Sequence, residues 1–359
     1  MWKSKSPFRV NEKVQMPLVG VVVAGISLTL MICGNPGNMG FCIACFLRDI
    51  AGALGLQQSP MQYLRPEILG IVLGAFLTTL ATKEWKSHGA SAPVTRFLLG
   101  MSVMIGALIF LGCPLRMVLR IGGGDLNAVV GLLGFTGGIG IGAFFLKKGF
   151  NLKKAHNISR TDGLVLPLFA LILLFIVILF PALLHDSAAA LRAPVLYGLI
   201  AGLIMGLVGV LSRLCFSGSI RNLLLFKDFT MFSAIFTMIV VIVIGNIIRG
   251  KFNLSFAGQP IAHTEHLWNF FGLLLVGFAS ILLSGCPFRQ LIKAGSGDID
   301  STITVFGMIF GAAIAHNFKM ASSAAGVTIN GKIGFIAAII LVSAIAFYNT
   351  FYEKHEAKD

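Results

Sequence analysis

Long runs without charged residues alternate with short polar segments along almost the whole chain. The runs cover residues 14–47, 68–82, 97–115, 126–146, 163–184, 193–212, 229–248, 267–288, 301–318 and 333–352. About 20 helical residues cross the roughly 30 Å hydrocarbon core of a bilayer, and most of the runs are that long. The pattern therefore predicts an all-α membrane protein of about ten transmembrane helices.

The run at 68–82 is the shortest, so its helix needs flanking residues to cross a bilayer. We expect this helix to begin near Tyr63, with Arg65 and Glu67 reaching back to the membrane interface. Within the first run, the apolar stretch ends at Asn35 and Pro36 rather than at a small-residue cleavage site. We therefore expect the N-terminus to be retained.

Composition and charge agree with a lipid environment. The chain is 56% hydrophobic and 12% charged, and its mean hydropathy is +0.89, unlike a soluble domain. Placing Lys3, Lys5 and Arg9 in the cytoplasm puts most of the 28 Lys and Arg residues on the inner side. This predicts a multi-pass protein of the inner (plasma) membrane with both termini cytoplasmic. Topology accounts for the net charge of +14, and without a basic domain or RNA-binding motif no nucleic acid partner is expected.

An internal repeat appears when the chain is compared with itself at an offset of 173 residues. The segment Gly112-Cys113-Pro114-Leu115-Arg116 matches Gly285-Cys286-Pro287-Phe288-Arg289, and Gly122-Gly123-Gly124-Asp125 matches Gly295-Ser296-Gly297-Asp298. The same offset pairs Cys42 with Cys215 and Arg48 with Arg221. The chain is therefore predicted to contain two related halves.

The helix count gives these halves opposite orientations. Four helices form each unit, a linking helix separates the units, and a last helix follows the second unit. The first unit takes residues 1–150, the linker loop and helix 151–190, the second unit 191–325, and the C-terminal helix and tail 326–359. One linking helix inverts the second unit, as in many secondary transporters that bind substrate between inverted repeats.

Four segments are too short, too polar or too rich in glycine to span the membrane. They lie at residues 38–54, 113–124, 213–227 and 286–297. We expect re-entrant half-helices there, because irregular backbone at membrane depth persists only against protein or a water-filled path. These segments predict where the transport pathway runs.

The two Gly-Cys-Pro motifs suggest anion sites. Glycine lets the preceding helix stop, and proline suits the first position of the next helix. Cys113 and Cys286 would then sit at helix N-termini, where free N–H groups and the helix dipole attract anions. The alternative is that each cysteine is a small buried hydrophobe. Two copies in register, each followed by arginine, favour the anion site.

Basic residues follow both motifs at helical spacing. Arg116 and Arg120, like Arg289 and Lys293, are four residues apart and share a helix face. Charges inside a membrane are costly and usually functional, but these side chains could equally extend to the headgroups. The same two interpretations hold for Arg48 and Arg221, and Asp49 could simply neutralise Arg48.

Cys42 and Cys45 form a Cys-x-x-Cys motif, which elsewhere indicates dithiol redox chemistry or a metal site. No second such motif completes a metal site, and the repeat partner Cys215 lacks the second thiol. We predict Cys42 as a pathway thiol and leave Cys45 open.

Other polar groups have simpler interpretations. Asp125 and Asp298 are expected to cap helices. His263, Glu265 and His266 resemble a metal cluster only loosely, and a solvated loop is the better interpretation. No Walker loop, nucleotide fingerprint or hydrolase triad occurs, so neither a metal nor another cofactor is expected.

These motifs resemble the YeeE/YedE family of sulphur-transport membrane proteins, whose hallmark is a duplicated unit with a central Gly-Cys-Pro. The segment from Gly34 to Asp49 resembles the YedE branch, which is associated with selenium metabolism. The resemblance implies an hourglass-shaped protein that passes thiosulphate along cysteines, here Cys113, Cys286 and either Cys42 or Cys45. It also implies a small cytoplasmic partner, a TusA-like sulphur carrier. Two cysteines in the first loop, and Cys215, depart from the family pattern.

The leading hypothesis is thus a permease, not an enzyme, for a small sulphur- or selenium-containing anion. Its pathway residues would be Cys42, Cys45, Cys113, Cys215, Cys286, Arg48, Arg116, Arg221 and Arg289. One alternative is a membrane thiol oxidoreductase that uses Cys42 and Cys45. Another is a general small-anion channel without cysteine chemistry.

Overall fold

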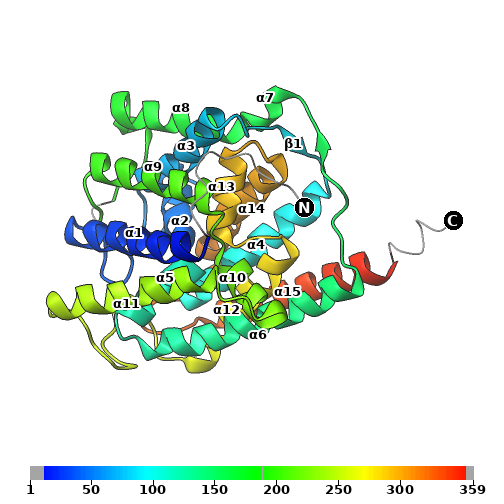
Figure 1. Ribbon diagram of the computed structural model, residues 1–359. Coiled ribbons are helices and arrows are strands. Elements are labelled where there is room, and N and C mark those ends of the chain that lie inside the picture. The colour runs from blue at the N-terminus through cyan, green and yellow to red at the C-terminus, as the bar shows by residue number, and fades with distance from the viewer. Residues whose placement is uncertain (1–11, 188, 353–359) are drawn as a thin grey trace.

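The computed structural model describes residues 12–187 and 189–352, and this part of the chain is almost entirely helical. The basic residues Lys3, Lys5 and Arg9 and the tail after Tyr352 lie outside the described residues. Figure 1 shows long helices lying side by side, with short helices between them. The prediction of an all-α protein is confirmed.

Seven helical stretches of the described residues are long and apolar enough to cross a membrane. They are α1 (Glu12–Ile32), α4 (Pro93–Phe110) with α5 (Pro114–Gly122), α6 (Leu126–Lys148), α9 (Val195–Ser212) with α10 (Phe216–Phe226), α12 (His266–Leu282) with α13 (Pro287–Gly295), α14 (Ile299–Asn317), and α15 (Ile329–Phe347) with the π-helix η2 (Tyr348–Tyr352). The apolar helices α3 (Pro66–Ala81), α8 (Val165–Leu179) and α11 (Phe232–Ile248) are shorter. Every predicted run thus contains an apolar helix, while ten crossings remain a prediction.

The remaining elements are small. They are the helices α2 (Ile43–Ala53) and α7 (Arg160–Gly163), the 3₁₀ turn η1 (Pro181–Leu183), and two antiparallel strands of two residues, β1 (His88–Gly89) and β2 (His156–Asn157). Strand β1 also bridges to Asp298, at the start of α14. The pair therefore ties the loops before α4 and after α6 to the second half of the chain.

Helix α3 differs from its prediction. It begins at Pro66 rather than near Tyr63, because proline restricts the residue before it to extended backbone and favours the first helical position. Arg65 and Glu67 do not reach the surface, since each is only 1% exposed. Arg65 pairs with Asp49 at 2.7 Å instead. Glu67 lies 4.0 Å from the same guanidinium, so two buried carboxylates, not the membrane interface, satisfy this charge.

Helices that the repeat relates pack on helices of the opposite half in a symmetric pattern. Helix α4 packs on α14, and its counterpart α12 packs on α6. In the same way α3 packs on α9, while α11 packs on α1. The sequence repeat is therefore also a repeat of contacts.

Close glycine contacts show the directions of these helices. A Cβ atom at Gly70 would lie 2.8 Å from Cα of Gly202, and one at Gly206 would lie 2.8 Å from the carbonyl carbon of Gly74, so α3 and α9 run parallel. Helices α4 and α12 run antiparallel: Gly106 of α4 lies beside Val276 of α12, and Phe110, one turn later in α4, lies beside Gly272, one turn earlier in α12. Small residues let these backbones approach closely. Antiparallel packing of two equivalent helices is what a two-fold axis across them produces.

Large apolar side chains cover the outside of the bundle. Helices α8 and α15 expose many of them, including Leu168, Leu171, Ile172, Phe175, Ile178, Ile329, Ile333, Ile336 and Ile340. Exposed apolar surface this extensive is unusual for a soluble protein and fits contact with lipid. The polar and sulfur-containing groups described below lie inside this shell.

Candidate functional site

Four short helices begin at cysteines. Cys113 and Cys286 are the N-cap residues of α5 and α13, with proline at the first helical position, as the sequence predicts. Cys42 and Cys215 are likewise the N-caps of α2 and α10. With 9 or 11 residues and about 1.5 Å per residue, none of these helices can cross a bilayer alone.

Sequence analysis missed the capping role of Cys42 and Cys215. Both residues have φ −147° and extended backbone. The Cys42 sulfur accepts the backbone N–H of Cys45 at 3.3 Å, and the Cys215 sulfur accepts that of Gly218 at 3.4 Å. The 173-residue offset between the two cysteines was the available signal, since equivalent positions in a repeat share local structure.

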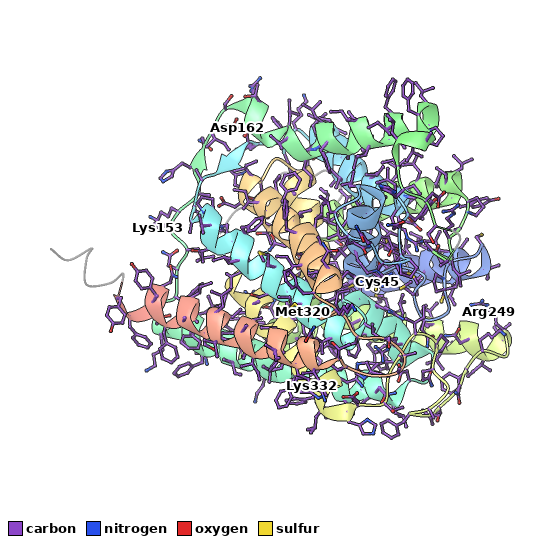
Figure 2. All side chains as sticks on the ribbon, turned by 180° about the vertical axis from the view of Figure 1, so that it is seen from behind. Cys45, Lys153, Asp162, Arg249, Met320 and Lys332 are labelled. Carbon is purple, nitrogen blue, oxygen red and sulfur yellow. The ribbon has the colours of Figure 1, made fainter. Side chains whose placement is uncertain are left out.

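The structure brings three cysteines together in the first half, and we call Cys42, Cys45 and Cys113 the first thiol site. The Cys42 thiol interacts with both other thiols, and all three side chains are buried. The Cys113 sulfur also interacts with the backbone N–H groups of Arg116 and Ala44. Figure 2 shows Cys45 among the inner helices, whereas Lys153 and Arg249 lie at the periphery.

The second half repeats this arrangement with two cysteines, the second thiol site. The sulfur atoms of Cys215 and Cys286 are 3.9 Å apart. The Cys286 sulfur interacts with the backbone N–H groups of Arg289 and Phe216. Each thiol site therefore collects the N-termini of two short helices.

The glycine of each Gly-Cys-Pro motif acts differently from the prediction. Helix α4 ends through Leu111, at φ 62°, and the turn after α12 uses Ser284, at φ 58°, so neither glycine adopts the left-handed conformation. Instead, a Cβ atom at Gly112 would lie 2.8 Å from Cδ of Arg116. At Gly285 it would lie 3.0 Å from Cγ of Arg289. Both glycines make room for the arginine four residues later.

Arg116 carries a buried charge beside the first thiol site. Its side chain is 0% exposed, and its Nη1 lies 3.6 Å from the Cys45 sulfur. The guanidinium donates to the carbonyl oxygens of Asn38 at 3.2 Å, Ile261 at 3.1 Å, and Leu111. Within the described residues it forms no ion pair with a carboxylate. An uncompensated cation in a low-dielectric interior attracts an anion strongly.

Two other basic residues of the first half are neutralised. Arg120 pairs with Asp125 at 2.6 Å, and Asp125 also caps α6 as predicted. Arg48 pairs with Asp49 at 2.6 Å. None of these groups extends to the surface. Arg116 thus differs from Arg120 and Arg48 in having no carboxylate partner among the described residues, a difference that the sequence did not reveal.

A cavity of about 530 Å³ opens next to the second thiol site, and we call it the basic cavity. Its polar lining consists of Thr79, Glu84, Lys86, His88, Asn157, Arg213, Arg289, Lys293, Ser296 and Asp298. Asp298 caps α14 as predicted, and Lys293 lies 2.8 Å from it. Burial raises the pKa of Asp298, but Lys293, His88 and Ser301 outweigh burial, so this pKa lies below its ordinary value. Asp298 is therefore ionised at neutral pH and compensates Lys293.

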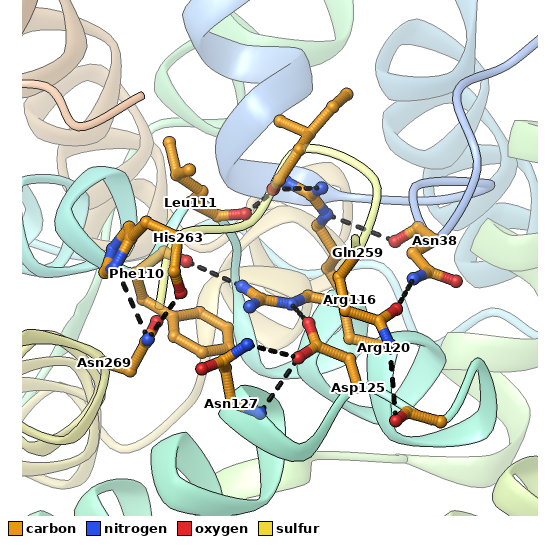
Figure 3. A network of polar contacts seen from close by, with 12 residues as sticks. Asn38, Phe110, Leu111, Arg116, Arg120, Asp125, Asn127, Gln259, His263 and Asn269 are labelled. Carbon is orange, nitrogen blue, oxygen red and sulfur yellow. Dashed lines mark hydrogen bonds and ion pairs between the residues drawn. The ribbon is translucent and has the colours of Figure 1, made fainter. Parts of the chain in front are cut away.

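Beside the first thiol site, residues 253–263 lie against Arg116 and Asn38 (Figure 3). The Gln259 amide donates to the carbonyl oxygens of Asn253 at 2.6 Å and Ser255 at 3.0 Å, and accepts from Asn38 at 3.3 Å. The carbonyl oxygen of Ile261, in the same segment, accepts a hydrogen bond from Arg116. These bonds hold residues 253–263 over the guanidinium of Arg116.

Some predicted residues lie away from both thiol sites. Arg221 bonds to Asn222 at 3.1 Å and lines a small apolar pocket with Phe144 and Lys147. His263 bonds to the Ile109 carbonyl oxygen at 2.8 Å, while Glu265 accepts from the Val327 N–H at 2.9 Å. Among the described residues, no group of three or more His, Cys, Asp or Glu side chains is placed to hold a metal ion.

Comparison with known proteins adds one finding. Residues 211–356 match the model of a family described as Sulphur transport (Sulf_transp), and this match includes the second thiol site and the arginines of the basic cavity. A search of the curated proteins found no match. Together with the apolar helices, the family match indicates that the chain is similar to membrane transporters of sulphur compounds.

Proposed function

We propose that the protein is a permease that carries a small sulphur- or selenium-containing anion past two thiol sites, one in each of two inverted repeats. One observation carries this proposal. In each half, two cysteines meet at the N-termini of two half-helices, and an arginine without a carboxylate partner follows one of them. A thiol kept only for packing would not require this repeated arrangement.

The chemistry of each thiol site suits such an anion. Each half-helix N-terminus contributes roughly half a positive charge together with free N–H groups. These groups and the guanidinium of Arg116 or Arg289 would hold the oxygen atoms of the anion. The thiols of Cys42 and Cys113, and later of Cys215 and Cys286, would donate S–H to its terminal sulphur or selenium. Thiosulphate-like and selenium compounds both have this form.

The predicted topology gives the pathway a direction. With the N-terminus in the cytoplasm, the loops that line the basic cavity are cytoplasmic, and residues 253–263 lie on the outer side. The anion would pass from the first thiol site to the second and leave through the cavity. A TusA-like sulphur carrier would receive it there, on the cytoplasmic side of the inner membrane.

A second candidate function follows from the contact between Cys42 and Cys45. These thiols could cycle between dithiol and disulfide, which would make the protein a membrane thiol oxidoreductase. Cys45 has no counterpart in the second half, where Gly218 takes its place. The Cys-x-x-Cys form of this reaction is therefore confined to the first half, while a dithiol in the second half would have to use Cys215 and Cys286, whose sulfur atoms are 3.9 Å apart.

Uptake measurements separate the two functions. Cells lacking other routes should accumulate labelled thiosulphate, selenite or selenosulphate when they produce the wild-type protein, compared with an empty vector. Under the permease proposal, Cys45→Ala retains uptake within a few-fold, because the Cys42 and Cys113 thiols remain. Loss of all uptake in Cys45→Ala would favour the oxidoreductase. No accumulation of any of the three anions by the wild type would refute the permease.

A further inference from the structure

We propose that Arg213 and Arg289 form a binding site for a doubly charged oxyanion in the basic cavity, next to the second thiol site. This inference rests on the proposed function for its physiological ligand. It goes further by locating a binding subsite in the basic cavity and by adding Arg213, which no sequence motif indicates.

The two arginines reach the cavity from different chain segments. Arg213 ends α9 in the left-handed conformation, at φ 55°, two residues before Cys215. Arg289 lies in the first turn of α13, three residues after Cys286. Each arginine is therefore within three residues of a cysteine of the second thiol site, and both line the same cavity.

Neither guanidinium has a charge partner. Arg289 donates only to the Gly209 carbonyl oxygen, at 3.3 Å, and within the described residues neither it nor Arg213 forms an ion pair. The cavity lining contains four basic side chains, Lys86, Arg213, Arg289 and Lys293, against two acidic ones, Glu84 and Asp298. Four minus two leaves two positive charges, which a dianion would balance.

Guanidinium groups favour oxyanions over other anions. The planar fork donates two parallel N–H bonds to two oxygen atoms, so two arginines can hold a tetrahedral oxyanion from two sides. The cavity of about 530 Å³ is many times the roughly 30 Å³ that one water molecule occupies. A small oxyanion can therefore enter with part of its hydration shell.

The first half cannot build this site. The repeat places Gly40 where the second half has Arg213, and a Cβ atom there would lie 2.1 Å from the Ser27 carbonyl oxygen. That position has no room for any side chain. The first thiol site thus offers one uncompensated arginine, and the second offers two.

Equilibrium binding to the purified full-length protein in detergent tests the inference. The probes are sulphate and thiosulphate, which are dianions, and thiocyanate, which is a monoanion with a terminal sulphur, all at constant ionic strength. We expect the wild type to bind both dianions, and Arg213→Gln to weaken both by roughly 10- to 100-fold. Thiocyanate binding should change less than threefold. Arg249→Gln, which removes a guanidinium at the exposed end of α11, is the matched control and should bind all probes like the wild type.

Other outcomes would overturn the inference. No dianion binding by the wild type, unchanged dianion binding in Arg213→Gln, or equal loss of thiocyanate would each do so. If Arg213→Gln does not fold, protection of Arg213 in the wild type against an arginine-specific dicarbonyl by thiosulphate decides the question. Failure of the proposed function looks different, because dianions would then bind through Arg213 in a protein that supports no uptake in cells.

Discussion

The two thiol sites share a backbone plan but differ in their surroundings. Both place cysteines at the N-termini of two short helices, and both are followed by an arginine at the same spacing. Residues 253–263 lie over Arg116 beside the first thiol site, whereas Arg289 beside the second lines the basic cavity. The repeat therefore explains the shared chemistry, and the residues outside the repeated motifs decide access.

The difference also concerns charge. In the first half, carboxylates neutralise Arg48 and Arg120 and leave Arg116 uncompensated. In the second half, Asp298 neutralises Lys293 and leaves Arg289 and Arg213. Basic residues with the same sequence spacing thus divide into neutralised and uncompensated groups, according to whether an acid lies within reach.

The largest expected effect is on stability, and it concerns the difference between the paired Arg120 and the unpaired Arg116 within α5. Arg120→Gln removes one partner of the buried pair with Asp125 and leaves an uncompensated carboxylate. We expect the free energy of unfolding to fall by about 3–5 kcal/mol, as is usual when a buried ion pair is broken. Thermal unfolding in detergent measures the loss. Unchanged stability would show that Arg120 has no structural role.

Arg116→Gln, four residues away, provides the contrast. It breaks no ion pair, so we expect a folded protein whose thiosulphate uptake falls roughly 10- to 100-fold, the value of a charge-assisted hydrogen bond. Melting curves and uptake rates on the same variant separate the two effects. A variant that unfolds but transports normally once stabilised would contradict the assignment.

A smaller effect tests why the first half lacks a second arginine. Gly40→Ala places a Cβ atom against the Ser27 backbone, which cannot move aside easily. We expect a loss of about 1–3 kcal/mol, the usual range for overpacking. Gly25→Ala in α1 is the matched control, because its Cβ atom would meet nothing within 4 Å. Equal melting temperatures for the two variants would show that Gly40 has room for a side chain.

The smallest expected effect concerns access to the first thiol site. Gln259→Ala removes the bonds that hold residues 253–263 over Arg116, so the cover should open more often. We expect a membrane-impermeant maleimide to label the Cys42 and Cys45 peptides roughly tenfold faster, the change that about 1.4 kcal/mol produces. Asn330→Ala, which removes a single exposed hydrogen bond, is the control. Faster labelling of Cys215 and Cys286 to the same extent would indicate general loosening instead.

Much of the fold could be read from the sequence. Runs of apolar residues located the helices, and the 173-residue offset predicted the short helices that follow both Gly-Cys-Pro motifs and the aspartate caps. These features depend on neighbours in the chain, so local patterns reveal them. The side chains of Arg65 and Glu67 were misplaced at the membrane interface because Asp49 and Asn35, 16 and 32 residues away, bind them inside the protein.

The parts of the site that the sequence did not reveal depend on long-range contacts. Asn38 and Gln259 are 221 residues apart, and no periodicity brings them together. Arg213 stands outside the repeated motif, and its counterpart is a glycine. Which arginine is neutralised depends on the side chains that fold around it, so residue spacing alone left Arg116 and Arg120 equivalent.

The rate of thiosulphate uptake by Cys113→Ser and Cys286→Ser tests most directly whether the thiols of both sites lie on one pathway. Serine keeps the size and hydrogen-bonding capacity of cysteine but loses the soft sulfur, and Cys33→Ser controls for the substitution at a cysteine outside both sites. The account predicts that each of the two variants loses at least tenfold in uptake while Cys33→Ser stays near the wild-type rate. Wild-type uptake by both variants would contradict it and would indicate a general anion channel.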